Sequence, residues 1–266
     1  MLLQGRRILV TGVLTPASLP FAAARQAQQD GAEVVLTSFG RAMRLTERSA
    51  ARLPEKPTLL ELDVTRDQDF VSLVGEFEGR KWQLDGIVHG VAFAPAEALG
   101  GGFLTTPWEA AATALRVSAF SLKQLAVAME PLFPNAGGSV VTLDFDASLA
   151  WPGYDWMGVA KAGLESVVRY LAHYLGAHRI RVNAVSAGPV YTTSAKGIPG
   201  FPSFPEVFDR QAPLGWDARD SDPIGKAVVA LLSDYFPATT GEIIHVDGGY
   251  HAVGAAIDPV EADPEG

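Results

Sequence analysis

Cysteine is absent from this sequence of 266 residues, and its absence excludes several kinds of site at once. No disulfide can staple the chain, and no thiolate can act as a nucleophile or bind zinc through sulfur. A reducing environment fits this composition, so we expect a cytoplasmic protein. Long hydrophobic runs are also absent, and the N-terminal MLLQGRRILV lacks the regions of a signal peptide. We therefore expect neither export by a standard signal nor a membrane span.

Positive charge is scarce relative to negative charge. The chain has 21 Lys and Arg residues against 30 Asp and Glu residues, a formal net charge of −9. An acidic protein repels a phosphate backbone, which argues against a nucleic-acid partner. The five histidines show no ligand spacing such as H-E-x-x-H, and no G-x-S-x-G elbow occurs. We therefore expect no metal site and no acyl-transfer triad.

The sequence does contain apolar runs rich in Val, Ile and Leu that alternate with stretches of helical period, as expected of βαβ units with a buried parallel sheet. Right-handed crossovers then predict an α/β fold, a Rossmann-type doubly wound parallel seven-stranded sheet of order 3-2-1-4-5-6-7. Strands are expected near residues 6–12, 32–38, 58–64, 84–90, 138–144, 180–186 and 242–247. Helices are expected near residues 19–30, 41–52, 67–79, 108–132, 156–176 and 221–233.

A chain of this length can bury one core, so residues 1–254 are expected to form a single dinucleotide-binding domain. Residues 255–266 read as an acidic, frayed tail. The segment 193–215 is rich in proline and aromatic residues without a long helical period, which predicts a loop or a short helix that acts as a lid. The helix at 156–176 carries one apolar stripe, for the core or a subunit interface: Met157, Ala160, Leu164, Val167, Val168, Leu171 and Leu175.

Ligands of such sheets bind beyond the carboxyl ends of the strands, so the loops there hold the candidate site. After the first strand, Gly12 permits a close backbone approach, and Ser18 is a candidate N-cap of a helix whose N-terminus could hold a pyrophosphate. Only one glycine of the usual G-x-G-x-x-G is present, so an ordinary strand–turn–helix is the alternative. Pro20 removes one N–H donor from this first turn.

The ends of the second and third strands offer residues for an adenine. Phe39 could pack beside the ring, and Asp63 and Val64 could hold its amine and its face; the alternative for Asp63 is an N-cap of the next helix. No acidic residue marks a ribose here, and Arg41 either reaches a 2′-phosphate or is simply solvated. After the sixth strand, small residues in Ala187-Gly188-Pro189-Val190 would let the backbone approach a nicotinamide, with the Thr192 hydroxyl beyond them.

Tyr154 and Lys161 form the strongest local pattern. Seven residues are two helical turns, so the two side chains would share one helix face, roughly 10 Å apart along the axis. A phenol near a fixed ammonium suits hydrogen-bond donation to an oxygen that gains negative charge. The alternative is a surface lysine with an interfacial tyrosine.

These residues belong to longer stretches that resemble a known family. The stretches TGVLTPASLPF, LELDVT, DFD, YDWMGVAKAGLES, AGPVYT, APLGWD and LLSDYFPATTGEIIHVDGGYHAVGA resemble the enoyl-acyl-carrier-protein reductases, a divergent branch of the short-chain dehydrogenases. The similarity runs from about residue 5 to residue 254. Its most specific element is Tyr-x6-Lys, because carbonyl-reducing members of the superfamily carry Tyr-x3-Lys and an upstream serine. Gly158 and Val141 occupy those two positions here, which counts against a ketoreductase.

The resemblance implies a homotetrameric reductase that uses NADH, acts on trans-2-enoyl thioesters of acyl carrier protein, and serves fatty acid or related acyl chain synthesis. It implies Tyr154 as the hydrogen-bond donor to the thioester carbonyl, Lys161 as the ribose contact, and Phe145 as the residue that orients substrate. The implied cofactor-binding residues are Gly12, Ser18, Leu19, Phe39, Asp63, Val64, Gly90, Lys161, Gly188, Pro189, Val190 and Thr192. The implied substrate-binding residues are Phe93, Phe145, Tyr154, Met157 and Phe201.

Three features depart from the family pattern. Gly90-Val91-Ala92 stands where the family commonly has Ser-Ile-Gly, Pro20 lacks a donor, and the segment from Thr193 to Ala212 is shorter than the substrate loop of long-chain members. The short segment predicts short or medium acyl chains. Two alternatives remain open: a short-chain dehydrogenase that reduces a ketone or a diffusible enone in secondary metabolism, and a non-catalytic NAD(H)-binding protein.

Overall fold

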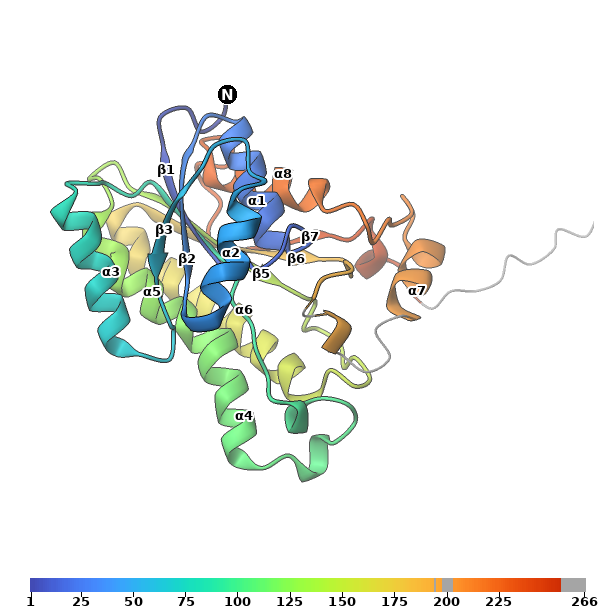
Figure 1. Ribbon diagram of the computed structural model, residues 1–266. Coiled ribbons are helices and arrows are strands. Elements are labelled where there is room, and N and C mark those ends of the chain that lie inside the picture. The colour runs from blue at the N-terminus through green and yellow to red at the C-terminus, as the bar shows by residue number, and fades with distance from the viewer. Residues whose placement is uncertain (194, 198–202, 255–266) are drawn as a thin grey trace, which may run out of the picture.

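The computed structural model describes residues 1–193, 195–197 and 203–254. A parallel sheet of seven strands runs through its centre in the order β3-β2-β1-β4-β5-β6-β7 (Figure 1). The strands are β1 (Arg7–Thr11), β2 (Glu33–Ser38), β3 (Thr58–Glu61), β4 (Gly86–His89), β5 (Gly138–Asp144), β6 (Ile180–Ala187) and β7 (Ile243–Val246). The predicted α/β fold and strand order are confirmed, because consecutive parallel strands joined by right-handed crossovers have few other arrangements.

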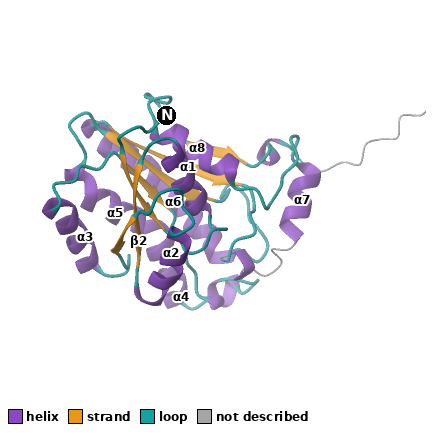
Figure 2. Cartoon of the chain, turned by 45° about the horizontal axis from the view of Figure 1, so that its top comes forward, coloured by secondary structure: helices purple, strands orange, loops and turns teal. Residues whose placement is uncertain are grey.

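Helices cover both faces of the sheet (Figure 2). On one face lie α1 (Leu19–Gln29), α2 (Met43–Ala50) and α8 (Asp222–Leu232), which pack in one core cluster with β1 and β2. On the other lie α3 (Asp67–Gly79), α5 (Ser121–Met129) and α6 (Asp155–Leu175). Strands that are buried on both faces carry continuous apolar runs, which is why they were readable in the sequence. None of the helices in the described part of the chain is long and apolar enough to span a membrane.

The apolar stripe of α6 belongs to the core. Six of its seven residues are buried, and Val167 is partly buried against the same cluster. Burial of this stripe fixes the rotation of α6 about its own axis, since its apolar face must turn toward the sheet. The helix therefore presents its first two turns to the carboxyl end of β5.

The predicted single helix over residues 108–132 is interrupted. The structure has α4 (Trp108–Leu115), a π-helical turn (Arg116–Phe120), α5, and a 3-10 turn (Glu130–Leu132). In the widened turn, the hydroxyl of Ser118 accepts from the N–H of Phe93 and donates to its carbonyl, at 2.9 and 3.0 Å. A π-turn inserts one residue into the helical register, so the helix can both bury its face and hold the loop after β4.

The segment after β6 contains a short 3-10 helix (Ala195–Gly197) and α7 (Ser203–Gln211). A short helix in this segment is therefore confirmed. Residue 194, residues 198–202 and the tail 255–266 lie outside the described residues, and with them the predicted substrate contact Phe201. Two predicted boundaries were too long: β3 ends at Glu61, and α2 spans only Met43–Ala50, preceded by a 3-10 turn (Gly40–Ala42).

His89 ties the end of β4 to its neighbours. Its ring is fully buried, and its two nitrogens lie 2.9 Å from the hydroxyls of Thr142 on β5 and Ser121 on α5. Burial, together with the nearby Lys161 ammonium, lowers the pKa of His89 to about 3. The ring is therefore neutral at physiological pH, when one nitrogen donates and the other accepts.

The loops after β1 and β4 cross in direct contact. Gly12 has a φ of +83°, and a Cβ built on it would lie 2.1 Å from the carbonyl oxygen of Gly90. A Cβ on Gly90 would lie 2.2 Å from Cγ of Pro20 and 2.8 Å from the carbonyl oxygen of Thr11. The Pro20 ring therefore occupies the space that a side chain at position 90 would need. Pro20 and Gly90, two departures from the family pattern, therefore pack directly against each other.

We predict that Gly90→Ser destabilises the protein by about 1–3 kcal/mol, because the new side chain overpacks against the rigid ring of Pro20. In a Pro20→Ala background the same change should cost less, since the ring is gone and only the Thr11 carbonyl still crowds the site. Urea unfolding of the wild type, the two single variants and the double variant measures this coupling. Strictly additive costs would contradict the packing explanation.

Candidate active site

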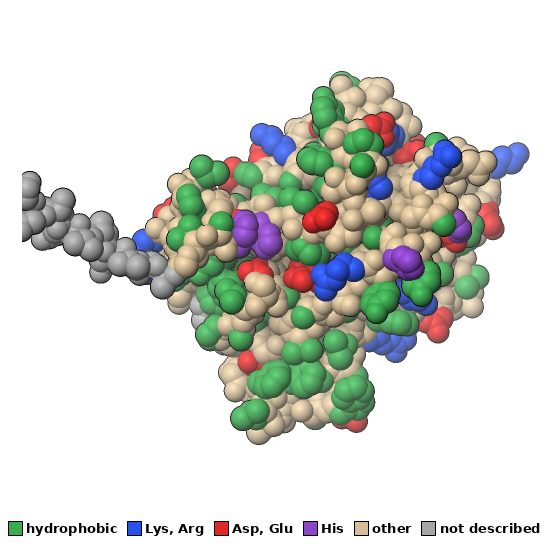
Figure 3. Space-filling view, turned by 180° about the vertical axis from the view of Figure 1, so that it is seen from behind, with side chains coloured by type: hydrophobic (Ala, Val, Ile, Leu, Met, Phe, Trp, Pro, Cys, Tyr) green, Lys and Arg blue, Asp and Glu red, His purple; other side chains and the backbone are tan. Residues whose placement is uncertain are grey.

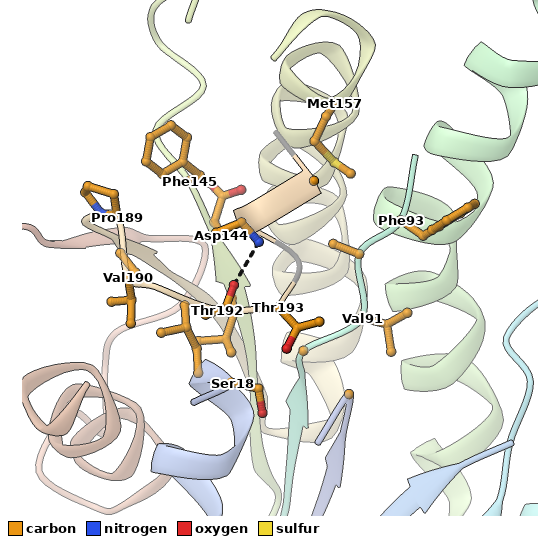
Figure 4. Close-up of a pocket in the computed structure, with 18 of the residues that line it drawn as sticks. Ser18, Val91, Phe93, Asp144, Phe145, Met157, Pro189, Val190, Thr192 and Thr193 are labelled. Carbon is orange, nitrogen blue, oxygen red and sulfur yellow. Dashed lines mark hydrogen bonds between the residues drawn. The ribbon is translucent and has the colours of Figure 1, made fainter. Parts of the chain in front are cut away.

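A cavity of about 510 Å³ lies at the carboxyl ends of β1, β4, β5 and β6 (Figure 4). Ser18 lies at one end of it, Phe145 and Met157 at the other, and Phe93 stands across from Pro189 and Val190 (Figure 4). Most of the residues implied by the resemblance line this one cavity: Gly12, Ser18, Leu19, Gly90, Phe93, Phe145, Tyr154, Met157, Lys161, Gly188, Pro189, Val190 and Thr192.

The end of the cavity beside α1 is suited to an anion, but not through the group that the sequence indicated. Ser18 occupies the N-cap position as predicted, yet its hydroxyl makes no cap and donates to the carbonyl of Thr15 at 2.7 Å. The buried hydroxyl of Thr15, which sequence reasoning missed, has no hydrogen-bond partner among the described residues. A buried polar atom without a partner is costly unless a ligand satisfies it. Thr15 and the N-terminus of α1 are therefore the candidate phosphate contacts.

Lys161 and Tyr154 both line the cavity. Tyr154 is the N-cap of α6, and Asp155 after it has a φ of +45°, so the predicted helical turn between the two side chains is distorted at its start. Both side chains are buried. The Lys161 ammonium donates to the carbonyl of Leu143 at 2.9 Å. The structure therefore rejects the alternative of a surface lysine, because this ammonium is held inside the site by the end of β5.

The phenol of Tyr154 stays protonated at neutral pH. Burial raises the pKa of Tyr154 well above its ordinary range, and the negative charge of Asp144 raises it further. A protonated phenol can donate a hydrogen bond to a substrate oxygen. The donation is strongest when that oxygen carries developing negative charge in a site that excludes water.

Asp144 is the functional candidate that residue-by-residue reasoning missed. It ends β5, its side chain is fully buried, and one carboxylate oxygen lies 3.8 Å from Nζ of Lys161. Neither carboxylate oxygen has a hydrogen-bond partner among the described residues. An acidic residue directly after a buried strand, in the stretch DFD, was the available signal.

An aromatic cluster walls the far end of the cavity. Phe145 packs its ring against Trp151 and Tyr154, with centroids 5.0 and 5.4 Å apart. From α7, Phe204 and Phe208 each approach Phe145 to 6.4 Å. Phe145 therefore lies between the tyrosine and the segment after β6, and its ring can guide an apolar chain that enters the cavity.

The end of β6 brings bare backbone to the cavity. A Cβ on Gly188 would lie 2.6 Å from the indole of Trp216, whose Nε1 donates to the carbonyl of Pro189 at 2.8 Å. Position 188 must therefore remain glycine, and the Pro189 peptide is held in place from behind. Thr192 accepts a hydrogen bond from the N–H of Ala195 at 3.0 Å, so its hydroxyl can still donate to a ligand (Figure 4).

Three of the implied cofactor contacts do not line the cavity. Phe39 follows β2 and is 45% exposed, whereas Val64 is buried beyond the end of β3. Asp63 accepts hydrogen bonds from the N–H and hydroxyl of Thr65, and the N-cap of α3 is Arg66, so the alternative of a capping role for Asp63 is wrong. Phe39, Asp63 and Val64 follow β2 and β3, at the same edge of the sheet as the cavity.

The cavity fits a dinucleotide by the character of its lining. Gly12 and Gly188 expose backbone at two positions where no side chain has room, and Thr15, whose hydroxyl has no hydrogen-bond partner among the described residues, lines the end beside α1. The buried ammonium of Lys161 supplies a fixed donor between these points. In the described part of the chain, no group of three His, Asp or Glu residues is placed to hold a metal ion.

Comparisons with known proteins agree with this geometry. The family described as Enoyl-(Acyl carrier protein) reductase matches residues 12–251. The enoyl-[acyl-carrier-protein] reductase [NADH] of Mycolicibacterium smegmatis is 42% identical over 264 residues, covering 93% of this chain and 97% of that protein. The protein of the same name from Mycobacterium avium is 44% identical over 263 residues, with the same coverage.

The enoyl-[acyl-carrier-protein] reductase [NADPH] FabI of Staphylococcus aureus is 36% identical over 253 residues, covering 94% of this chain and 98% of that protein. Its name gives NADPH as the cofactor, where the two mycobacterial names give NADH. The fold, the site and the extent of these matches lead to one conclusion: the chain belongs to the enoyl-acyl-carrier-protein reductase family.

Proposed function

We propose that this protein is an NADH-dependent enoyl-acyl-carrier-protein reductase, which reduces trans-2-enoyl thioesters in the synthesis of fatty acids or related acyl chains. The observation that carries the proposal is the pairing of buried Tyr154 and Lys161 in one cavity, in a chain that belongs to this family. Val141, at the position where carbonyl-reducing relatives hold a serine, is fully buried in β5 and offers no hydroxyl. The arrangement therefore favours an enoyl thioester over a ketone.

When bound, NADH supplies a hydride to Cβ of the enoyl thioester. Tyr154 donates a hydrogen bond to the thioester oxygen, which gains negative charge as the enolate forms and before Cα is protonated. Lys161 donates to the nicotinamide ribose and holds positive charge beside the tyrosine. Because both side chains are buried, their donors are already oriented before substrate enters, and little reorganisation is needed during the reaction.

We assign the remaining contacts from their positions in the cavity. Thr15, Ser18, Leu19 and Gly12 lie where the pyrophosphate would bind, and Gly90 lies beside them. Gly188, Pro189, Val190 and Thr192 lie where the nicotinamide would bind, whereas Phe39, Asp63 and Val64 lie on the adenine side. Phe93, Phe145 and Met157 line the substrate end, and Phe201 is proposed from the resemblance alone.

We also propose that residues 1–254 act as one dinucleotide-binding domain of a cytoplasmic homotetramer that receives its substrate on acyl carrier protein. The single sheet with a core on each face supports one domain. Exposed apolar side chains at Phe103, Leu104 and Trp108 support association with another chain. In the view from behind, hydrophobic side chains gather on the protrusion at the bottom, where Figure 1 places α4 (Figure 3).

The proposed function is tested by following NADH oxidation with crotonyl and dodecenoyl thioesters. We expect turnover of enoyl thioesters and a higher kcat/KM with NADH than with NADPH, because Gly40 carries no side chain toward a 2′-phosphate. Reduction of free ketones without reduction of enoyl thioesters would instead select the ketone-reducing alternative. A clear preference for NADPH would show that Arg41 binds the 2′-phosphate.

Tyr154→Phe should lower kcat by about 100-fold or more, because one donor to a developing oxyanion is lost. The dissociation constant for NADH should change little, since the phenol acts on the substrate. Lys161→Met, which keeps the buried stem but removes the ammonium, should instead weaken NADH binding. Stopped-flow turnover and fluorescence titration separate the two effects. A Tyr154→Phe variant with wild-type turnover would exclude the oxyanion role.

The specificity constant should stop rising with acyl length near medium chains. Phe204 and Phe208 on α7 pack onto Phe145, so α7 closes the cavity at that end instead of leaving an open crevice. Each methylene that stays in water forfeits roughly 0.8 kcal/mol of binding. Measurement of kcat/KM across a series of enoyl thioesters checks this limit. A continued rise through long chains would show that α7 moves aside.

A further inference from the structure

Asp144 and Lys161 form a buried charge pair in the lining of the cavity. The exposed fraction of the Asp144 side chain is 0% and that of the Lys161 side chain is 6%, and their nearest charged atoms are 3.8 Å apart. Neither oxygen of Asp144 has a hydrogen-bond partner among the described residues, whereas Lys161 also donates to Leu143. The Lys161 ammonium is therefore the main opposite charge beside this buried carboxylate.

We propose that Asp144 is a positioning residue that acts through Lys161, keeping the buried lysine charged and directed at the cofactor ribose. The inference rests on the proposed function, in which Lys161 binds NADH. Asp144 does not have to touch the cofactor or the substrate for this role. It provides the only negative charge that is fully buried beside the ammonium within the described residues.

The pKa shifts of the pair and its neighbours agree with Asp144 acting through Lys161. Burial lowers the pKa of Lys161, and the charge of Asp144 opposes that fall. Burial raises the pKa of Asp144, Lys161 opposes the rise, and Glu165 on α6 and Asp146 in the following loop add to it, so that the pKa stands at about 7. Tyr154 and His89 face the pair as neutral groups. Without the carboxylate, desolvation would release the lysine proton at a lower pH.

The proposal predicts that Asp144→Asn has a defect in NADH binding that depends on pH. Across a titration from about pH 6 to about pH 9, Asp144→Asn should bind NADH within about threefold of the wild type at the acidic end. Toward the alkaline end the variant should lose the Lys161 ammonium before the wild type does, because burial lowers the pKa of Lys161 and Asp144 no longer opposes that fall, so the variant should bind NADH more weakly there, by about tenfold or more. Because the two charges are 3.8 Å apart, loss of the Asp144 carboxylate should lower the pH at which NADH binding weakens by about one unit or more.

Fluorescence titration of NADH over this pH range tests the proposal with wild type, Asp144→Asn and a matched control, Asp146→Asn. Asp146 loses the same charge two residues away, in a loop where it caps Ser148, and its variant should follow the wild-type pH profile. Lys161→Met should bind NADH weakly at both pH values. An equal loss at both pH values in Asp144→Asn would mean a purely structural role, and an unchanged profile would mean no role; either result overturns the proposal.

A second measurement uses the protein without cofactor. The pKa of Asp144 is about 7 in the folded state against 3.8 as the ordinary value, so its contribution to stability is full below about pH 4 and is lost as pH rises through 7. Between about pH 5 and pH 8 the unfolding equilibrium constant of the wild type should therefore rise relative to that of Asp144→Asn by about tenfold or more. His89 is present in both proteins, and its titration cancels in this comparison.

The two measurements separate the failure of this inference from the failure of the proposed function. A wild type that binds no NADH and reduces no enoyl thioester would reject the function, and the pH dependence of unfolding in Lys161→Met compared with the wild type would then decide whether Asp144 is coupled to Lys161. If Asp144→Asn cannot fold, infrared titration of the wild type and Lys161→Met replaces it: removal of the ammonium should raise the pH at which the signal of the protonated Asp144 carboxyl disappears, because Lys161 opposes the rise in the pKa of Asp144. An unchanged titration of Asp144 in Lys161→Met would overturn the inference.

Discussion

Burial of both faces of a parallel sheet is the constraint on which the rest of this structure depends. Each strand is apolar on two sides, so α1, α2 and α8 must cover one face while α3, α5 and α6 cover the other. Parallel strands also end at the same edge, which gathers the loops after β1, β4, β5 and β6 around one cavity. The position of the site thus follows from how the core is buried, before any catalytic residue is considered.

Close packing at that edge leaves little freedom for the loops. The backbone of Gly12 packs against that of Gly90, and Gly90 packs against the ring of Pro20. Gly188 packs against the indole of Trp216. Such contacts make the backbone around the cavity rigid, as a preorganised site requires. They also explain how the chain departs from its family at two positions together: a proline ring replaces the volume of a side chain on the opposite loop. The departures therefore do not indicate a degraded site.

Electrostatics in the site depends on burial more than on the number of charges. The protein is acidic overall, yet its cavity is organised around one ammonium, one carboxylate and one phenol, all shielded from water. In such surroundings a single charge shifts the pKa of each neighbour, because little solvent screens it. Burial keeps Tyr154 protonated and lowers the pKa of Lys161, so a nearby negative charge is needed to keep the lysine charged. Burial also raises the pKa of Asp144 toward neutrality.

The sequence by itself determined the strand pattern, the strand order, the Tyr154–Lys161 pair and the family, because these depend on periodicity and on spacing along the chain. Only the tertiary structure decided that a π-turn divides the helix over residues 108–132, that Ser18 does not cap α1, and that Asp144 is buried beside Lys161. It also decided that Pro20 and Gly90, far apart in sequence, touch. Periodicity shows which face of an element is buried, but not which atoms meet there, since contacts between distant segments depend on how the elements pack.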